Sequence, residues 1–128
     1  MSPLAAVARA EFLRTWNRCR DWLLAALEPG CGDEASLLAD LAAGRALLWT
    51  GEAAALVTQC VVDGRGPCLH VWLAGGELKS ILAMRPGVEA WARARGFERV
   101  TINGRRGWSR ALRRYGYAQV GDELERRL

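Results

Sequence analysis

The chain has 128 residues, of which 51% are hydrophobic and 25% charged, and it carries a net charge of +4. This length and composition suit one globular domain with a full apolar core and exclude a disordered or fibrous chain. No apolar run approaches the roughly 20 residues that cross a bilayer, and the N-terminus lacks a signal-peptide pattern, so we expect a cytoplasmic protein with no membrane partner.

Two helices are predicted at the start of the chain. Residues 5–27 place apolar side chains at intervals of three and four, as in an amphipathic helix: Phe12, Trp16, Cys19, Leu23 and Ala26. Pro29 and Gly30 end this helix. Asp33 is then a suitable N-cap for a shorter helix that ends at Gly44.

The middle of the chain is typical of β-structure. Segments 46–50 and 53–62 flank Gly51-Glu52, a two-residue hairpin turn with glycine first. Residues 63–67 form a second turn that leads to a strand over 68–73, so we expect an antiparallel meander. Several valines and leucines lie in near-continuous apolar runs, which predicts a sheet covered on both faces: Val57, Val61, Val71 and Leu73.

A helix–strand–helix–strand series completes the pattern. After Gly76 a helical segment turns apolar residues inward and is expected to end at Gly96. At Pro86-Gly87 we expect either a kink or a division into two abutting helices. Those inward residues are Leu78, Ile81, Leu82, Val88 and Trp91. Because a helix connects them, the strand 98–102 must run parallel to 68–73. A helix over 107–115 and a last strand from Tyr117, with a bulge near Gly121, follow.

The cysteines do not have metal-site spacing. Cys19, Cys31, Cys60 and Cys68 form no C-x-x-C pair, and the single histidine, His70, lies inside a predicted strand. We therefore expect buried free thiols and no metal site.

The order ααβββαβαβ resembles the fold of the GNAT acyl-CoA N-acyltransferase superfamily. The resemblance implies one α/β domain over residues 1–128, with a mixed central sheet that combines the meander and a parallel strand pair and is flanked by helices. In that family the turn after the fourth strand binds the pyrophosphate of acyl-CoA. Its counterpart here is Ala74, Gly75, Gly76 and Glu77, which keeps two glycines but lacks the leading Gln or Arg of the family pattern.

The family's catalytic residues find few counterparts. Gly116-Tyr117 matches the Gly-Phe that ends a second family signature, but the position of its general-acid tyrosine falls on Leu112, which cannot donate a proton. Tyr115 lies three residues away. The candidates for a general base are no stronger. Glu52 and Asp63 fall in predicted turns, and His70 has the features of a hydrogen-bonded core residue. The resemblance therefore assigns no catalytic residue, so whether the chain is an enzyme stays open.

The segment from residue 105 to 114 is rich in arginine. It predicts a contact surface, against the alternative of a solvated helix face, and its members are Arg105, Arg106, Trp108, Arg110, Arg113 and Arg114. An acidic protein partner is the first expectation. Nucleic acid is a weaker one, because few aromatic residues are interleaved with the arginines.

Residues 104–117 also resemble short GNAT-like proteins of phages and prophages, some of which are virion or assembly proteins. This resemblance implies a phage-type domain with degenerate catalytic residues and a structural or protein-interaction role, with phage structural proteins as partners and the virion as its location. No cofactor is expected in that role. The alternative is an active acetyl-CoA-dependent N-acetyltransferase with a shortened pyrophosphate loop.

Overall fold

The computed structural model describes residues 9–30, 32–103 and 107–128. The helices are α1 (Arg9–Ala26), α2 (Glu34–Ala42), α3 (Leu78–Ala94) and α4 (Trp108–Arg113). The strands are β1 (Leu47–Thr50), β2 (Ala54–Asp63), β3 (Gly66–Gly76), β4 (Arg99–Asn103), β5 (Ala118–Val120) and β6 (Glu123–Arg127). They form one sheet in the order β1-β2-β3-β4-β6-β5, in which only β3 and β4 are parallel. The predicted α/β class and mixed sheet are thus confirmed.

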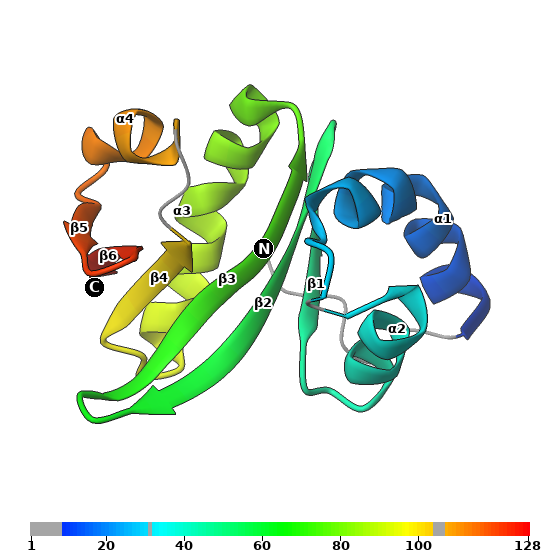
Figure 1. The fold of residues 1–128 in the computed structure, drawn as a ribbon, viewed down its shortest axis with the longest axis horizontal. Helices are drawn as coiled ribbons and strands as arrows, with labels where there is room; N and C mark the ends of the chain where they lie inside the picture. The colour runs from blue at the N-terminus through cyan, green and yellow to red at the C-terminus, as the bar shows by residue number, and fades with distance from the viewer. Residues whose placement is uncertain (1–8, 31, 104–106) are drawn as a thin grey trace.

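Helices lie on both faces of the sheet (Figure 1). On one side α1 and α2 pack on β1, β2 and β3 through a cluster that includes Trp16, Leu23, Leu37 and Val57. On the other side α3 and α4 cover a larger cluster that includes Trp49 and extends to Leu124 on β6. The three-layer arrangement follows from the apolar runs in β2 and β3, which give both sheet faces side chains to bury.

The two N-terminal helices are joined by polar contacts as well as by the core. Asp33 caps α2 through a reciprocal hydrogen-bond pair with Ser36, as expected from the sequence. Glu34 accepts hydrogen bonds from Arg20 at 2.6 Å and from the indole N–H of Trp16 at 3.3 Å. The Arg20 guanidinium holds the pKa of Glu34 below its usual value. The start predicted for α1 at residue 5 lies outside the described residues.

Four details differ from the sequence prediction. Helix α3 continues through Pro86 as one helix and is not two abutting helices, because buried Met84 and Val88 on either side hold both halves against the sheet. Leu78, expected inward, is 48% exposed in the first turn of this helix. The β1–β2 turn is longer than two residues, since the last cross-strand pair is Thr50 with Ala55.

The fourth difference lies at the C-terminus. The single bulged strand expected there is a hairpin, because Gly121, with φ +61, and Asp122 reverse the chain between β5 and β6. The described helices include none that is long and apolar enough to cross a membrane.

Candidate functional site

The sheet opens where β3 and β4 separate. The two strands pair only from Leu69 to Val71 on β3, whereas β3 itself continues to Gly76 beside β2. At the same place β3 has one residue more than β2, since Val57 faces Leu73 and Thr58 faces Val71. Trp72 is therefore a β-bulge, which bends β3 away from β4. This creates a gap between two parallel strands at the centre of the molecule.

Trp108 lines the space beside this gap. Two cavities of about 30 Å³ each are both lined by Trp108, Val71 and Ile102. One extends towards α3 and α4, and the other extends towards Trp72 and the end of α1. A water molecule needs roughly 10–15 Å³ on this kind of measure, so each cavity has room for very few waters. Trp108 thus lines two voids, and neither has space for a larger ligand.

Trp108 differs from its expected setting. It is half-buried and packs against the core cluster of α3 and α4, whereas the sequence placed it on the predicted contact surface. The other residues predicted to form the contact surface divide into two groups. Arg110, Arg113 and Arg114 are exposed on α4, and Arg105 and Arg106 lie outside the described residues.

The predicted pyrophosphate turn is brought together in one place. Ala74, Gly75, Gly76 and Glu77 line a shallow groove with Trp22 and neighbouring residues of α1. A side chain on Gly75 would overlap the Trp22 carbonyl, and one on Gly76, whose φ is +107, would overlap the backbone of Ala53 and Ala54. Close packing therefore accounts for both glycines without a ligand.

The donors of this turn are partly used within the fold. The Glu77 N–H donates to the Ala53 carbonyl at 2.9 Å, and the Ala53 N–H donates to the Ser80 hydroxyl at 3.0 Å. The carboxylate of Glu77 is exposed at the N-cap of α3, where it favours the helix dipole and repels a phosphate. The turn thus serves to join β3, β2 and α3.

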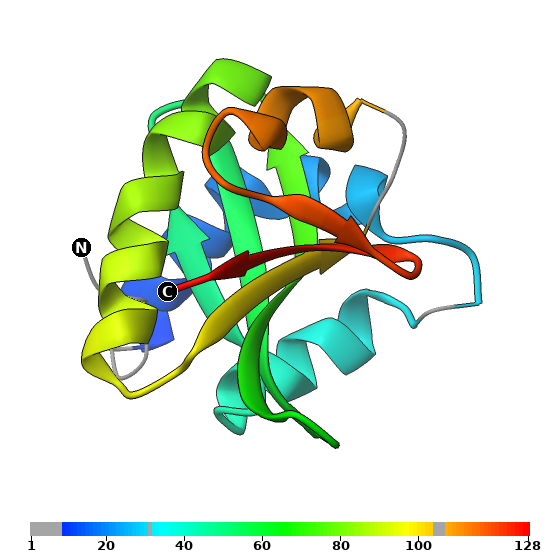
Figure 2. The same cartoon turned by 90° about the vertical axis from the view of Figure 1, so that its left-hand side faces the viewer.

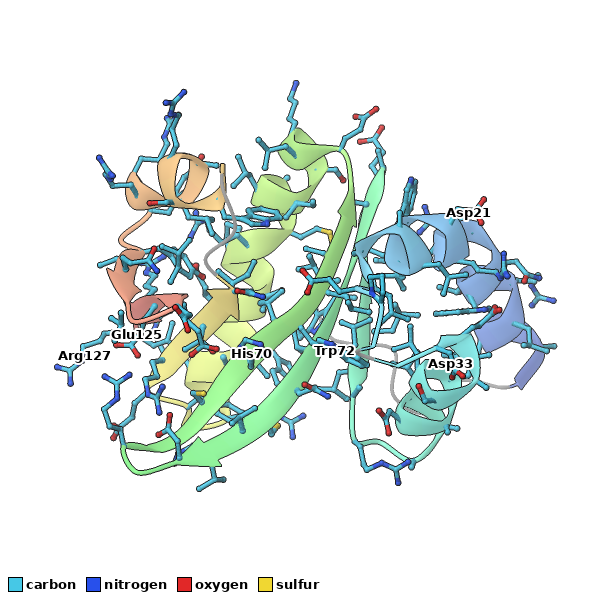
Figure 3. The ribbon with its side chains drawn as sticks, in the orientation of Figure 1. Asp21, Asp33, His70, Trp72, Glu125 and Arg127 are labelled. Carbon is cyan, nitrogen blue, oxygen red and sulfur yellow. The ribbon has the colours of Figure 1, made fainter. Side chains whose placement is uncertain are left out.

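His70 lies next to the opening of the sheet, directly before Val71. Its Nδ1 is 2.8 Å from Thr101 Oγ1 and 3.4 Å from Glu123 Oε2. Within the described part of the chain Nε2 has no hydrogen-bond partner. Burial lowers the pKa of His70 below its ordinary value, although the Glu123 carboxylate acts in the opposite direction. Figure 3 labels His70 and Trp72 on β3 and Glu125 on β6.

The two carboxylates weighed from the sequence have different settings. Glu52 is exposed in the β1–β2 loop. Asp63 accepts a hydrogen bond of 2.5 Å from Arg99, which lowers the pKa of Asp63, and it also accepts from the Arg65 N–H. Asp63 is thus engaged in an ion pair.

A buried ionic cluster beneath α3 escaped the sequence analysis. Glu89 accepts hydrogen bonds of 2.5 Å from both Arg85 and Arg126 and one of 2.7 Å from the Tyr117 hydroxyl. Burial raises the pKa of Tyr117 far above its ordinary value. Tyr115 stacks on the Arg85 guanidinium at 4.0 Å. The signal was present, because Glu89 is eight residues after Ile81 and so shares its inward face.

The remaining expected site residues are structural. Leu112, at the position of the family's general acid, is buried in the core. Cys19 and Cys68 are buried free thiols as expected, Cys60 is free but exposed, and Cys31 lies outside the described residues. In the described ranges no three metal-ligating side chains gather where they could hold an ion.

Comparison with known proteins gives a match of fold. No protein-family model matches the sequence, and no curated protein matches it either. A solved structure of an agmatine N-acetyltransferase, the S171A mutant in its apo form, superposes with a TM-score of 0.68 at 14% identity, over 95% of this chain and 97% of that one. The chain therefore has a GNAT-like fold, as the sequence resemblance implied.

Proposed function

We propose that this chain is a GNAT-like domain that does not bind acyl-CoA where β3 and β4 separate. It acts instead through contact with another protein. The observation that carries this proposal is the position of Trp108. With Val71 and Ile102 it lines both of the small cavities next to the place where the strands separate. Neither cavity has room for a ligand chain, so we expect such a chain to enter between β3 and β4 only if the side chains that line the cavities move.

The turn before α3 supports the same proposal. An anion-binding turn needs free backbone N–H groups and no negative charge nearby. Here the Glu77 N–H is bonded to Ala53, and the Glu77 carboxylate stands at the helix start. Leu112 in place of an acid leaves no proton donor on α4 at that position.

The proposed contact surface is the exposed face of α4. Arg110, Arg113 and Arg114 are exposed, and none of them forms a salt bridge with another described residue, while Arg114 lies over the Tyr115 ring. Arginine is enriched at the energetically important positions of protein interfaces, and a cluster of this sign fits an acidic surface. A phage-type, virion-associated role is the finer form of this proposal and rests on the sequence resemblance alone.

A second function, acyl transfer to an amine, is favoured by His70. Its unpartnered Nε2 could accept a proton from an amine, and Glu123 beside Nδ1 could stabilise the imidazolium that forms. The amine nitrogen would then form the new amide bond as the thiolate of CoA leaves. That thiolate would take its proton from water, since Leu112 has none to give.

Calorimetric titration distinguishes the two functions. Acetyl-CoA at millimolar concentration should give no binding isotherm with the wild-type chain, whereas poly-L-glutamate should bind. The double variant Arg110→Glu with Arg113→Glu should abolish the binding of poly-L-glutamate. Arg93→Glu, on the exposed face of α3, is the matched control and should leave it intact. A micromolar Kd for acetyl-CoA, worth about 8 kcal/mol, would overturn the proposal in favour of acyl transfer.

Two further readouts sharpen this experiment. If acetyl-CoA binds, Glu77→Gln should strengthen binding by removing a negative charge, and His70→Gln should leave binding intact but stop amide formation. If a DNA duplex binds more tightly than poly-L-glutamate, with an affinity that falls steeply with salt, the arginines are a nucleic-acid surface and the protein-contact proposal is wrong.

A further inference from the structure

The outer half of β2 has an open edge. β1 pairs with β2 only from Ala55 to Thr58, and β2 then continues to Asp63. Over residues 59–63 the strand is paired with β3 on one side, and no described strand pairs with its other side. Figure 2 shows the turn of the β2–β3 hairpin projecting past the helical layers. A row of main-chain donors and acceptors is therefore available to a partner.

The open edge is unusually apolar. Cys60 and Val61 are exposed, and Val62 is 78% exposed, the highest value among the large hydrophobic residues of the described chain. The prediction that Val61 is covered was wrong, because the helices on both faces end before this part of the hairpin. Proteins usually protect such an edge with charges or proline. The segment Gln59–Val62 has neither.

The hairpin is nevertheless held in a fixed position. Asp63 and Arg65, in and beside the turn, are bound to Arg99 on β4 and to Glu125 on β6. Arg99 also donates to the Gly66 carbonyl at 3.3 Å. These contacts direct the charges of the turn inwards and leave the opposite edge neutral. A fixed edge loses little conformational entropy when a second strand pairs with it.

We propose that the open edge of β2 is a self-association surface, on which a second copy of this chain adds its own β2 in antiparallel orientation. A two-fold axis at Val61 sets Cys60 of each copy opposite Val62 of the other, on one face of the joined sheet. On the same register Gln59, a side-chain donor, faces Asp63, a carboxylate. The edge is therefore complementary to itself in main-chain hydrogen bonds and in the polarity of the facing side chains.

The lack of unpaired charge at this edge favours a second copy of the chain as the partner. Two copies, each with a net charge of +4, can meet here without a like-charge pair, because the nearest charged groups, Asp63 and Arg65, are paired with residues of β4 and β6 in their own chain. A charged partner would find no unpaired charge of opposite sign at this edge, since Asp63 is paired with Arg99. A contact over residues 59–63 of each copy is small beside the roughly 1,200 Å² that a stable interface buries. We therefore expect a weak dimer that forms only at high protein concentration.

Sedimentation equilibrium of the full chain in reducing buffer tests this proposal. The wild-type protein should shift from monomer towards dimer as concentration rises. Val62→Lys should remain monomeric over the same range, because it places like charges at the contact. Val120→Lys is the matched control, since Val120 is an exposed valine on β5 at the opposite edge of the sheet, and it should behave as wild type.

Cross-linking supplies a second measurement. A short bismaleimide should join wild-type chains, and Cys60→Ser should abolish the cross-link while the sedimentation of this variant stays as in wild type. A monomer at every concentration, a dimer unaffected by Val62→Lys, one lost in Val120→Lys, or a cross-link that survives Cys60→Ser would each overturn the proposal. None of these outcomes bears on acyl-CoA, so this inference and the proposed function fail independently.

Discussion

The two halves of the sheet are built differently. In β1, β2 and the adjoining part of β3, apolar side chains are buried on both faces, as Leu48 and Trp49 or Ala54 and Ala55 illustrate. In β4 and β6 only one face is apolar, with Val100, Ile102 and Leu124 beneath α3 and α4. The other face carries Arg99, Thr101 and Glu125 in an ionic and hydrogen-bonded row. Continuous apolar runs therefore mark the strands that lie between two helical layers. Alternation of apolar and polar residues marks the strands that have helices on one face only.

The largest expected effect is in the doubly covered half. Trp49 is 1% exposed, donates to Thr58 Oγ1 at 2.9 Å and packs edge-on against Trp91. Trp49→Ala should lower the free energy of unfolding by about 3–5 kcal/mol, the range for large-to-small changes in a core. Urea denaturation measures this loss. Trp49→Phe, which keeps most of the apolar volume, should lose less, and equal losses would show that the N–H outweighs the packing.

A smaller effect is expected in the buried ionic cluster over the other half. Glu89→Gln leaves Arg85 and Arg126 near each other without their shared carboxylate. We expect a loss of about 2–3 kcal/mol, less than for a fully buried pair because Arg126 reaches water. Glu98→Gln, an exposed carboxylate in the α3–β4 loop, is the control for charge alone. A Glu89 variant as stable as that control would mean that the cluster contributes nothing.

The smallest effect is a pH dependence on the open polar face. Burial lowers the folded-state pKa of His70 below the ordinary 6.5, so the unfolded chain binds a proton that the folded chain resists. The stabilisation is complete above 6.5 and is lost as the pH falls towards the folded-state pKa. The Tm should therefore decline between about pH 7.5 and pH 5 in wild type, and decline less in His70→Gln. Parallel curves for the two proteins would contradict this assignment.

Most of the element order could be predicted from sequence because it depends on local periodicity and turn residues. The intervals in α1, the Asp33 cap and the parallel strand required by a helical crossover are local or topological signals. The extent to which helices cover β2 could not be predicted in this way. Val61 continues an apolar run, but its exposure depends on where α1, α2 and α3 end in space. The Gly121 turn was read as a bulge because both need a glycine in the same region of φ.

The candidate site was less accessible to sequence reasoning for the same reason. The turn from Ala74 to Glu77 does come together, since its residues are neighbours along the chain. Trp108 comes from a helix distant in sequence and lines the cavities beside β3 and β4. The separation of these strands depends on the Trp72 bulge, which no residue type indicates. Glu123 reaches His70 only because β6 inserts between β4 and β5 in the sheet order.

The contact between Gly75 and the Trp22 carbonyl affects how mutants of this turn can be interpreted. Adding a single methyl group at position 75 forces α1 and β3 apart, whether or not anything binds nearby. A Gly75→Ala variant that lost a ligand would therefore report a displaced helix, and its phenotype would imitate that of a damaged binding site. Glu77 is the informative position in this turn, because its exposed side chain can be changed while the two backbones stay in place.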